Sequence, residues 1–224
     1  MREIKVYPLI KSVSVIGTFT FISRCFGMIR DVLIFNLFGG TSLVASAFYI
    51  AFTLPNLFRR LFGEGALSSS FIPIFIKTKN EYSLKEAWKL NQKIGSLLLI
   101  TLIIITILGI LIFVCLSNLN FLNDKWSTTI DLSLIMFPYL IFICLTSLCM
   151  GTLNALNHFA TSAFSPILLN LILIVCMIFV FPLYNSELDK VVALSWSVII
   201  AGVAQLVFHF PIMIKKGAIF KFSN

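Results

Sequence analysis

Apolar side chains fill most of this chain in long runs that are separated by short polar segments. Each run is long enough for an α-helix to cross the hydrocarbon of a bilayer, which takes about 20 apolar residues. Two of them, 11–38 and 43–76, are interrupted by charged residues, and we count both as spans. The other four contain no Asp, Glu, Lys or Arg: 94–116, 132–156, 164–184 and 191–214. The pattern therefore predicts an all-α polytopic membrane protein with six transmembrane helices.

The composition agrees with a membrane protein. The chain is 59% hydrophobic and 12% charged, whereas a soluble domain has about 45–50% and about 25%. A net charge of +8 would suggest nucleic-acid binding in a soluble protein, but most of the cations lie between the apolar runs, so no nucleic-acid partner is expected. The five cysteines lie within apolar runs without metal-ligand spacing, and we expect neither a metal nor another cofactor.

The positions of lysine and arginine predict the orientation in the membrane. With six spans, eleven of these residues fall on one side, in the N-terminal segment, the connection 77–93 and the C-terminal tail. Only Lys125 and Lys190 fall on the other side. Because cytoplasmic connections carry the excess of lysine and arginine, we expect both termini to be cytoplasmic.

The connection 77–93 has apolar residues at helical spacing among five lysines. We expect an amphipathic helix of its own at the cytoplasmic interface, held there by anionic membrane lipids. A role in substrate recognition is the alternative for this segment.

Six charged residues lie inside the two interrupted spans: Arg24, Arg30, Asp31, Arg59, Arg60 and Glu64. A charge near the bilayer centre costs about 2.5–3.5 kcal/mol on insertion scales, so such residues persist mainly where they face a polar interior. Four arginines against two acids leave a positive balance, and the arginine fork suits phosphate oxygens. The set therefore predicts an anion site within the membrane. The alternative is that some of these residues snorkel to the interface or form ion pairs that serve packing.

Helical geometry groups some of these charges. Arg24 and Asp31 lie on nearly one helical face, whereas Arg30 points about 120° away from Arg24 and is expected to serve a different neighbour. Arg60 and Glu64 are four residues apart and share a face.

Uncharged polar residues give weaker indications. Four of them either line a cavity or form hydrogen bonds across helices: Asn154, Asn157, Ser165 and Asn170. His158 and His209 lie at expected span ends, where we expect interfacial positions.

Two motifs resemble those of a known family. Residues 23–31, SRCFGMIRD, are similar to the S-R-x-L-G-x-x-R-D motif in the first helix of the MurJ (MviN) lipid II flippases. Residues 54–73 are similar to the L-P-N-L-x-R-R-x-x-x-E-G-A-x-S-x-x-F-x-P signature of the same family. Shorter similarities follow at 137–139, 153–157 and 163–170, so the resemblance runs along nearly the whole chain.

This resemblance implies a MurJ/MATE-like transporter of the multidrug/oligosaccharidyl-lipid/polysaccharide exporter superfamily, and not an enzyme. Such proteins lie in the bacterial inner membrane and move lipid II, a lipid-linked peptidoglycan precursor, between the leaflets by alternating access. By its motifs, the resemblance assigns Arg24, Arg30, Asp31, Arg59, Arg60 and Glu64 to the central cavity that receives the pyrophosphate headgroup.

The chain departs from the family pattern in two ways. Family members have two lobes, and residues 1–224 resemble the N-terminal lobe only. The chain is therefore expected to be either a truncated sequence or one half of a split protein, whose partner would be a separate chain that supplies the C-terminal lobe. Ser46 stands at a position that is usually acidic, which leaves open any role of that acid in gating or ion coupling.

Three alternatives to this flippase half remain open at the level of sequence. The first is a remnant without transport activity, and the second is another exporter of the same superfamily. The third is a membrane enzyme that acts on a lipid pyrophosphate. An enzyme of that kind needs a nucleophile or general base near the phosphate, or a metal held by carboxylates. His158 and His209 lie on other spans, and the sequence has no D-x-x-D-like cluster.

Overall fold

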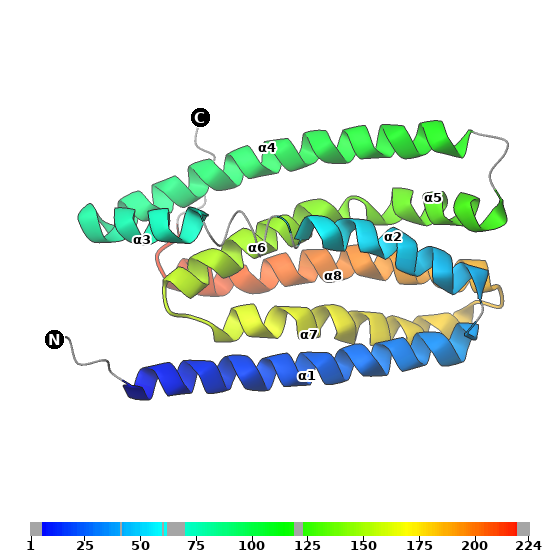
Figure 1. The fold of residues 1–224 in the computed structure, drawn as a ribbon, viewed down its shortest axis with the longest axis horizontal. Helices are drawn as coiled ribbons and strands as arrows, with labels where there is room; N and C mark the ends of the chain where they lie inside the picture. The colour runs from blue at the N-terminus through cyan, green and yellow to red at the C-terminus, as the bar shows by residue number, and fades with distance from the viewer. Residues whose placement is uncertain (1–5, 41, 60, 62–69, 119–122, 219–224) are drawn as a thin grey trace.

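The computed structural model describes residues 6–40, 42–59, 61, 70–118 and 123–218, with side chains from residue 14 onward. The regular structure of these residues is helical throughout, which confirms the all-α class. Figure 1 shows the helices lying side by side along one long axis. Their bounds are α1 Val6–Phe38, α2 Leu43–Arg59, α3 Ile72–Glu81, α4 Leu84–Ser117, α5 Asp124–Met136, α6 Tyr139–Ala155, α7 Ala160–Val175 and α8 Glu187–Lys215. A π-helical turn, Cys176–Val180, and a 3-10 turn, Phe181–Leu183, extend α7.

Eight α-helices in the described residues replace the six expected. Within the expected span 43–76 the structure has α2 up to Arg59 and α3 from Ile72, and residues 60 and 62–69 lie outside the described part. Pro73 lies in the first turn of α3, where a missing N–H costs no helical hydrogen bond. The expected span 132–156 is a pair, α5 and α6, bent by 48° at Phe137 and Pro138. Proline cannot donate to the preceding turn, which accounts for the bend.

Within the described residues, three helices are long and apolar enough to cross a membrane on their own: α4, α7 with its extension to Leu183, and α8. The bent pair of α5 and α6 makes a fourth if it counts as one span, and α2 is a shorter apolar helix. Long apolar side chains cover the outer surface of α4, including Leu97, Ile100 and Ile104. The chain is an integral membrane protein.

The connection 77–93, expected to form a helix of its own, is divided between the end of α3 and the start of α4. The Ser83 hydroxyl accepts a hydrogen bond from the Glu86 backbone N–H and so caps the N-terminus of α4. From Leu84 the helix then continues without a break into the apolar run. The amphipathic pattern of this segment arises because Ala87 and Trp88 pack into the bundle.

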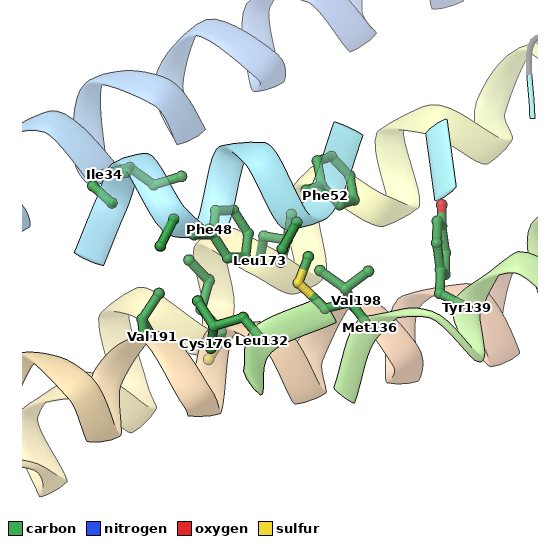
Figure 2. Packing of buried hydrophobic residues seen from close by; sticks show 14 of the residues in the cluster. Ile34, Phe48, Phe52, Leu132, Met136, Tyr139, Leu173, Cys176, Val191 and Val198 are labelled. Atoms are coloured by element: carbon green, nitrogen blue, oxygen red, sulfur yellow. The ribbon is translucent and has the colours of Figure 1, made fainter. Parts of the chain in front are cut away.

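The helices pack in layers around α8. Figure 1 shows α1 along α7 on one side of the bundle and α4 on the other, with α2, α5, α6 and α8 between them. Figure 2 shows the main core, where Phe48 and Phe52 of α2 meet Leu132 and Met136 of α5. Val198 of α8 belongs to the same cluster. Close packing of this kind, rather than hydrophobic burial, holds helices together in a bilayer.

Candidate functional site

A cavity of about 610 Å³ opens among five helices of the bundle. Its walls come from α1, α2, α6, α7 and α8, with Ile72 of α3 at one edge. Two of the expected site residues line it, Arg30 and Arg59. The polar side chains in its wall are Arg30, Thr53, Asn56, Arg59, Tyr139, Ser147, Asn154, Ser165, Asn170 and Gln205. We call this space the central cavity.

Arg30 is fixed in the wall of this cavity by partners on two helices. Its Nη1 donates to Asn170 Oδ1 of α7 over 2.8 Å. Its Nε and Nη2 donate to Asp31 Oδ1 over 3.0 and 2.8 Å. The Asn170 amide also donates to the Ser23 carbonyl over 3.2 Å, which ties α7 back to α1. Among the described residues, one N–H on each terminal nitrogen of Arg30 has no acceptor, so the guanidinium is able to bind an anion.

Asp31 belongs to the same polar cluster but lies toward its open side. Its side chain is 52% exposed, against 18% for Arg30. The Tyr49 hydroxyl of α2 lies 3.4 Å from Asp31 Oδ1, a long hydrogen bond that connects α2 to the pair. The carboxylate of Asp31 therefore helps to orient the Arg30 guanidinium and partly offsets its positive charge.

Arg24 faces a different space. It lines a shallow hollow on the surface of α1 together with Asp31, Gly27 and Met28. This agrees with the expectation that Arg24 and Asp31 share a face and that Arg30 serves another neighbour. The structure thus brings Arg30 and Arg59 to the central cavity and leaves Arg24 at the hollow beside it. Arg60 and Glu64 lie outside the described residues.

Neutral polar side chains form another part of the cavity wall. Gln205 donates through Nε2 to the Ser165 carbonyl over 2.8 Å, and the Tyr139 hydroxyl lies 3.4 Å from Gln205 Oε1. Within the described residues, Asn154 Oδ1 and Ser165 Oγ are buried without a hydrogen-bond partner. Unsatisfied polar atoms are costly inside a bilayer, so this wall suits a ligand or water that supplies donors.

Three of the four uncharged residues left open by the sequence line the cavity, and one of them, Asn170, also forms hydrogen bonds across helices. Asn154, Ser165 and Asn170 line the central cavity, whereas Asn157 lies in the turn after α6 with φ at +58°. Gln205 was not identified from the sequence, although an amide within the otherwise apolar run 191–214 was a usable signal.

His209, expected near the membrane interface, has a side chain that is fully buried between the helices. Its Nδ1 lies 2.7 Å from the Gln205 carbonyl, one turn earlier in the helix. His158 lies in the connection before α7, with Nε2 2.6 Å from Thr161 Oγ1. Neither histidine lines the central cavity.

The fold and the site define an integral membrane protein whose helices enclose a cavity lined by arginine and neutral polar side chains. The chain belongs to the lipid II flippase MurJ family, because the sequence model of that family, described as "Lipid II flippase MurJ", matches residues 34–223.

Relatives with established names agree with this assignment. The probable lipid II flippase MurJ of Rickettsia prowazekii is 41% identical over 213 residues, which cover 93% of this chain and 41% of the relative. The lipid II flippase MurJ of Burkholderia cenocepacia is 36% identical over 208 residues, which cover 91% of this chain and 40% of the relative. The chain therefore spans about two fifths of the length of these relatives.

A solved structure supports the fold. The lipid II flippase MurJ in an inward closed conformation is similar with a TM-score of 0.73 and 25% sequence identity. The matched region covers 92% of this chain and 43% of that structure.

Proposed function

We propose that this chain forms one lobe of a lipid II flippase and that its central cavity binds the pyrophosphate of the lipid headgroup. The observation that carries the proposal is the fixed guanidinium of Arg30, held by Asn170 and Asp31 with N–H groups left for an anion. Arg59 lines the same cavity and adds a second positive charge. A cation within the membrane region has a free-energy cost, and a bound anionic substrate would offset that cost.

The remaining charges of the proposed site have related roles. Arg24 and Asp31, at the hollow on α1, lie where a headgroup would enter from the open side of the lobe. Arg60 and Glu64 follow Arg59 in the same motif; Arg60 is proposed to add positive charge to the wall, and Glu64, four residues later, to pair with it. The neutral wall with Asn154 and Ser165 offers acceptors and hydroxyls to the uncharged part of a polar headgroup.

Transport requires a second lobe. Alternating access consists of two halves that rock against each other around a central site. The relatives extend well beyond the matched region, and α1 exposes large apolar side chains beside the charged hollow, with Phe21 69% and Phe35 62% exposed. We propose that a C-terminal lobe, on this or another chain, covers this face.

Complementation of a flippase-depleted bacterium tests the function. We expect the 224-residue chain alone to give no growth, and the chain expressed together with the C-terminal lobe of a MurJ relative to restore it. Growth with the chain alone would contradict the need for a second lobe. If the two lobes together do not restore growth, although both are present in the membrane, a remnant or an exporter of another lipid-linked substrate would be favoured.

We further propose that both termini of this chain face the cytoplasm of a bacterial cell. The Trp88 indole of α4 donates to the Lys216 carbonyl after α8 over 3.1 Å, so the lysine-rich ends of both helices lie together. The acidic residues Glu187 and Asp189 lie in the first turn of α8, at the other end of that helix, where Ser42 Oγ is 3.4 Å from Glu187 Oε2. Cytoplasmic segments carry the excess of lysine and arginine.

Cysteine labelling in intact cells checks this orientation. In a variant without native cysteines, we expect Asn123→Cys to react with a membrane-impermeant maleimide in spheroplasts. Lys216→Cys should react only after the membrane is permeabilised. Both side chains are exposed in the structure, so access depends on the side of the membrane. The reverse result would invert the proposed topology.

A further inference from the structure

A second groove lies between α4, α6 and α8, and it shares no lining residue with the central cavity. Its volume is about 260 Å³. Its wall is mostly apolar and consists of Trp88, Asn91, Gln92, Gly95, Ser96, Leu99, Leu145, Leu148, Cys149, Leu206, Phe210, Met213 and Ala218. We call it the α4–α6–α8 groove.

The groove runs along α4 for several turns. Its lining residues on that helix extend from Trp88 to Leu99, a rise of about 16 Å at about 1.5 Å per residue. Gly95 lets α6 approach this wall, because a Cβ there would lie 3.4 Å from Leu148 Cδ2. The shape is therefore long, narrow and apolar, and it lies on helices that cross the membrane.

Positive charge gathers at one end of the groove. Lys85 is exposed and lies three residues before Trp88, so it shares the lining face of α4 one turn further out. Lys216 is exposed at the end of α8, and its carbonyl accepts the Trp88 indole N–H. Lys89 is different, because its amine donates to Glu86 over 2.7 Å and its charge is offset.

An amide adds a polar contact close to the same end. Asn91 Oδ1 accepts from the Thr152 hydroxyl over 2.8 Å, which orients the side chain. Its amide nitrogen makes no hydrogen bond within the described part of the chain, although the residue is only 8% exposed. The amide of Asn91 is therefore a polar group in the groove wall, about two turns along α4 from Lys85.

We propose that the α4–α6–α8 groove binds an anionic phospholipid, with one acyl chain along the apolar wall and the phosphate beside Lys85 and Lys216. The charge at the groove end selects an anionic headgroup, because basic residues near a membrane surface attract anionic lipids. The apolar wall excludes a polar headgroup from the interior. The occupant is a lipid from the bilayer and not the transported substrate, since the groove has no wall in common with the central cavity.

Tryptophan quenching by brominated lipid tests this site. The chain has three tryptophans, and replacing Trp126 and Trp196 with phenylalanine leaves only Trp88, which lines the groove and is 3% exposed. The protein is placed in vesicles of equal phosphatidylcholine and phosphatidylglycerol, with bromine on the acyl chains of one lipid or the other. We expect stronger quenching when phosphatidylglycerol carries the bromine, with each of Lys85 and Lys216 contributing about fivefold to the preference.

Matched variants separate the groove from the surrounding bilayer. Ser96→Phe places a ring inside the groove and should abolish quenching of Trp88, whereas Ile104→Phe on the exposed surface of α4 should not. Lys85→Gln with Lys216→Gln keeps the apolar wall and should remove the preference for phosphatidylglycerol. A protein that keeps only Trp196, which is 55% exposed, should be quenched equally by both lipids.

Three results would overturn the proposal. Equal quenching of Trp88 by both brominated lipids would exclude selection of an anionic headgroup. Unchanged quenching in folded Ser96→Phe would show that the lipid lies elsewhere. Relief of quenching by a small fraction of undecaprenyl phosphate would assign the groove to a polyprenyl lipid instead.

Discussion

Replacing Arg30 with alanine is expected to abolish growth when the variant is expressed with a C-terminal lobe in a flippase-depleted strain. Arg30 donates to Asn170 and Asp31 and keeps N–H groups toward the central cavity. A hydrogen bond to a charged group is worth about 1.5–3 kcal/mol, so the loss corresponds to about a 10- to 100-fold weaker hold on the pyrophosphate. Growth curves and the amount of lipid II accumulated in the cell measure the effect.

Arg59→Ala should have the same direction of effect, because Arg59 lines the same cavity. Arg30→Lys keeps the charge but loses the planar fork, so we expect partial activity. Asn36→Ala, on an exposed part of α1, is the matched control and should grow normally. Full growth with both Arg30 and Arg59 replaced, at normal protein levels, would refute the proposed binding site.

Replacing Gly202 with alanine is expected to destabilise the helix bundle. A Cβ at this position would lie 2.6 Å from Tyr139 Cδ2 and 3.1 Å from Phe142 Cβ. Tyr139 is fully buried, so its ring can move away from the new Cβ only by shifting within the wall of the central cavity. Overpacking of this kind costs about 1–3 kcal/mol. Displacement of Tyr139 would also lengthen its contact with Gln205, which is already 3.4 Å.

Thermal unfolding in detergent, followed by circular dichroism, measures the change. The same substitution at Gly17 is the control, because a Cβ there meets nothing within 4 Å. Alanine at such a site stabilises a helix by about 0.5–1 kcal/mol relative to glycine. The two substitutions should therefore shift the unfolding temperature in opposite directions, and a rise for Gly202→Ala would show that α6 and α8 pack differently.

The hydrophobic pattern was sufficient for the class and for the approximate positions of the helices. The run 191–214 corresponds to most of α8, and the run 94–116 corresponds to the C-terminal part of α4. Such runs are informative because a membrane helix must satisfy its own backbone and expose apolar side chains to lipid. The divided spans were less predictable, since proline can either kink a helix or begin a new one.

The sequence did not show which partners the charged side chains of α1 would find. Helical geometry placed Arg24 and Asp31 on one face, but the structure pairs Asp31 with Arg30, its neighbour in the chain. A long arginine side chain can bend back to an adjacent carboxylate when another helix holds its far end, and here Asn170 of α7 does so. That contact joins residues 140 positions apart, which no local pattern reveals.

The sequence by itself determined that the chain enters a membrane as helices and that a few arginines stay among its apolar residues, because burial of charge leaves a clear anomaly in an apolar pattern. Only the tertiary structure decided which charges meet. It brought Arg30 and Arg59 to one cavity, left Arg24 at a separate hollow, and placed Ser165 and Gln205 in the wall of the same cavity as Arg30 and Arg59. Side-chain direction and the contacts between distant helices depend on packing, and packing is a property of the whole bundle.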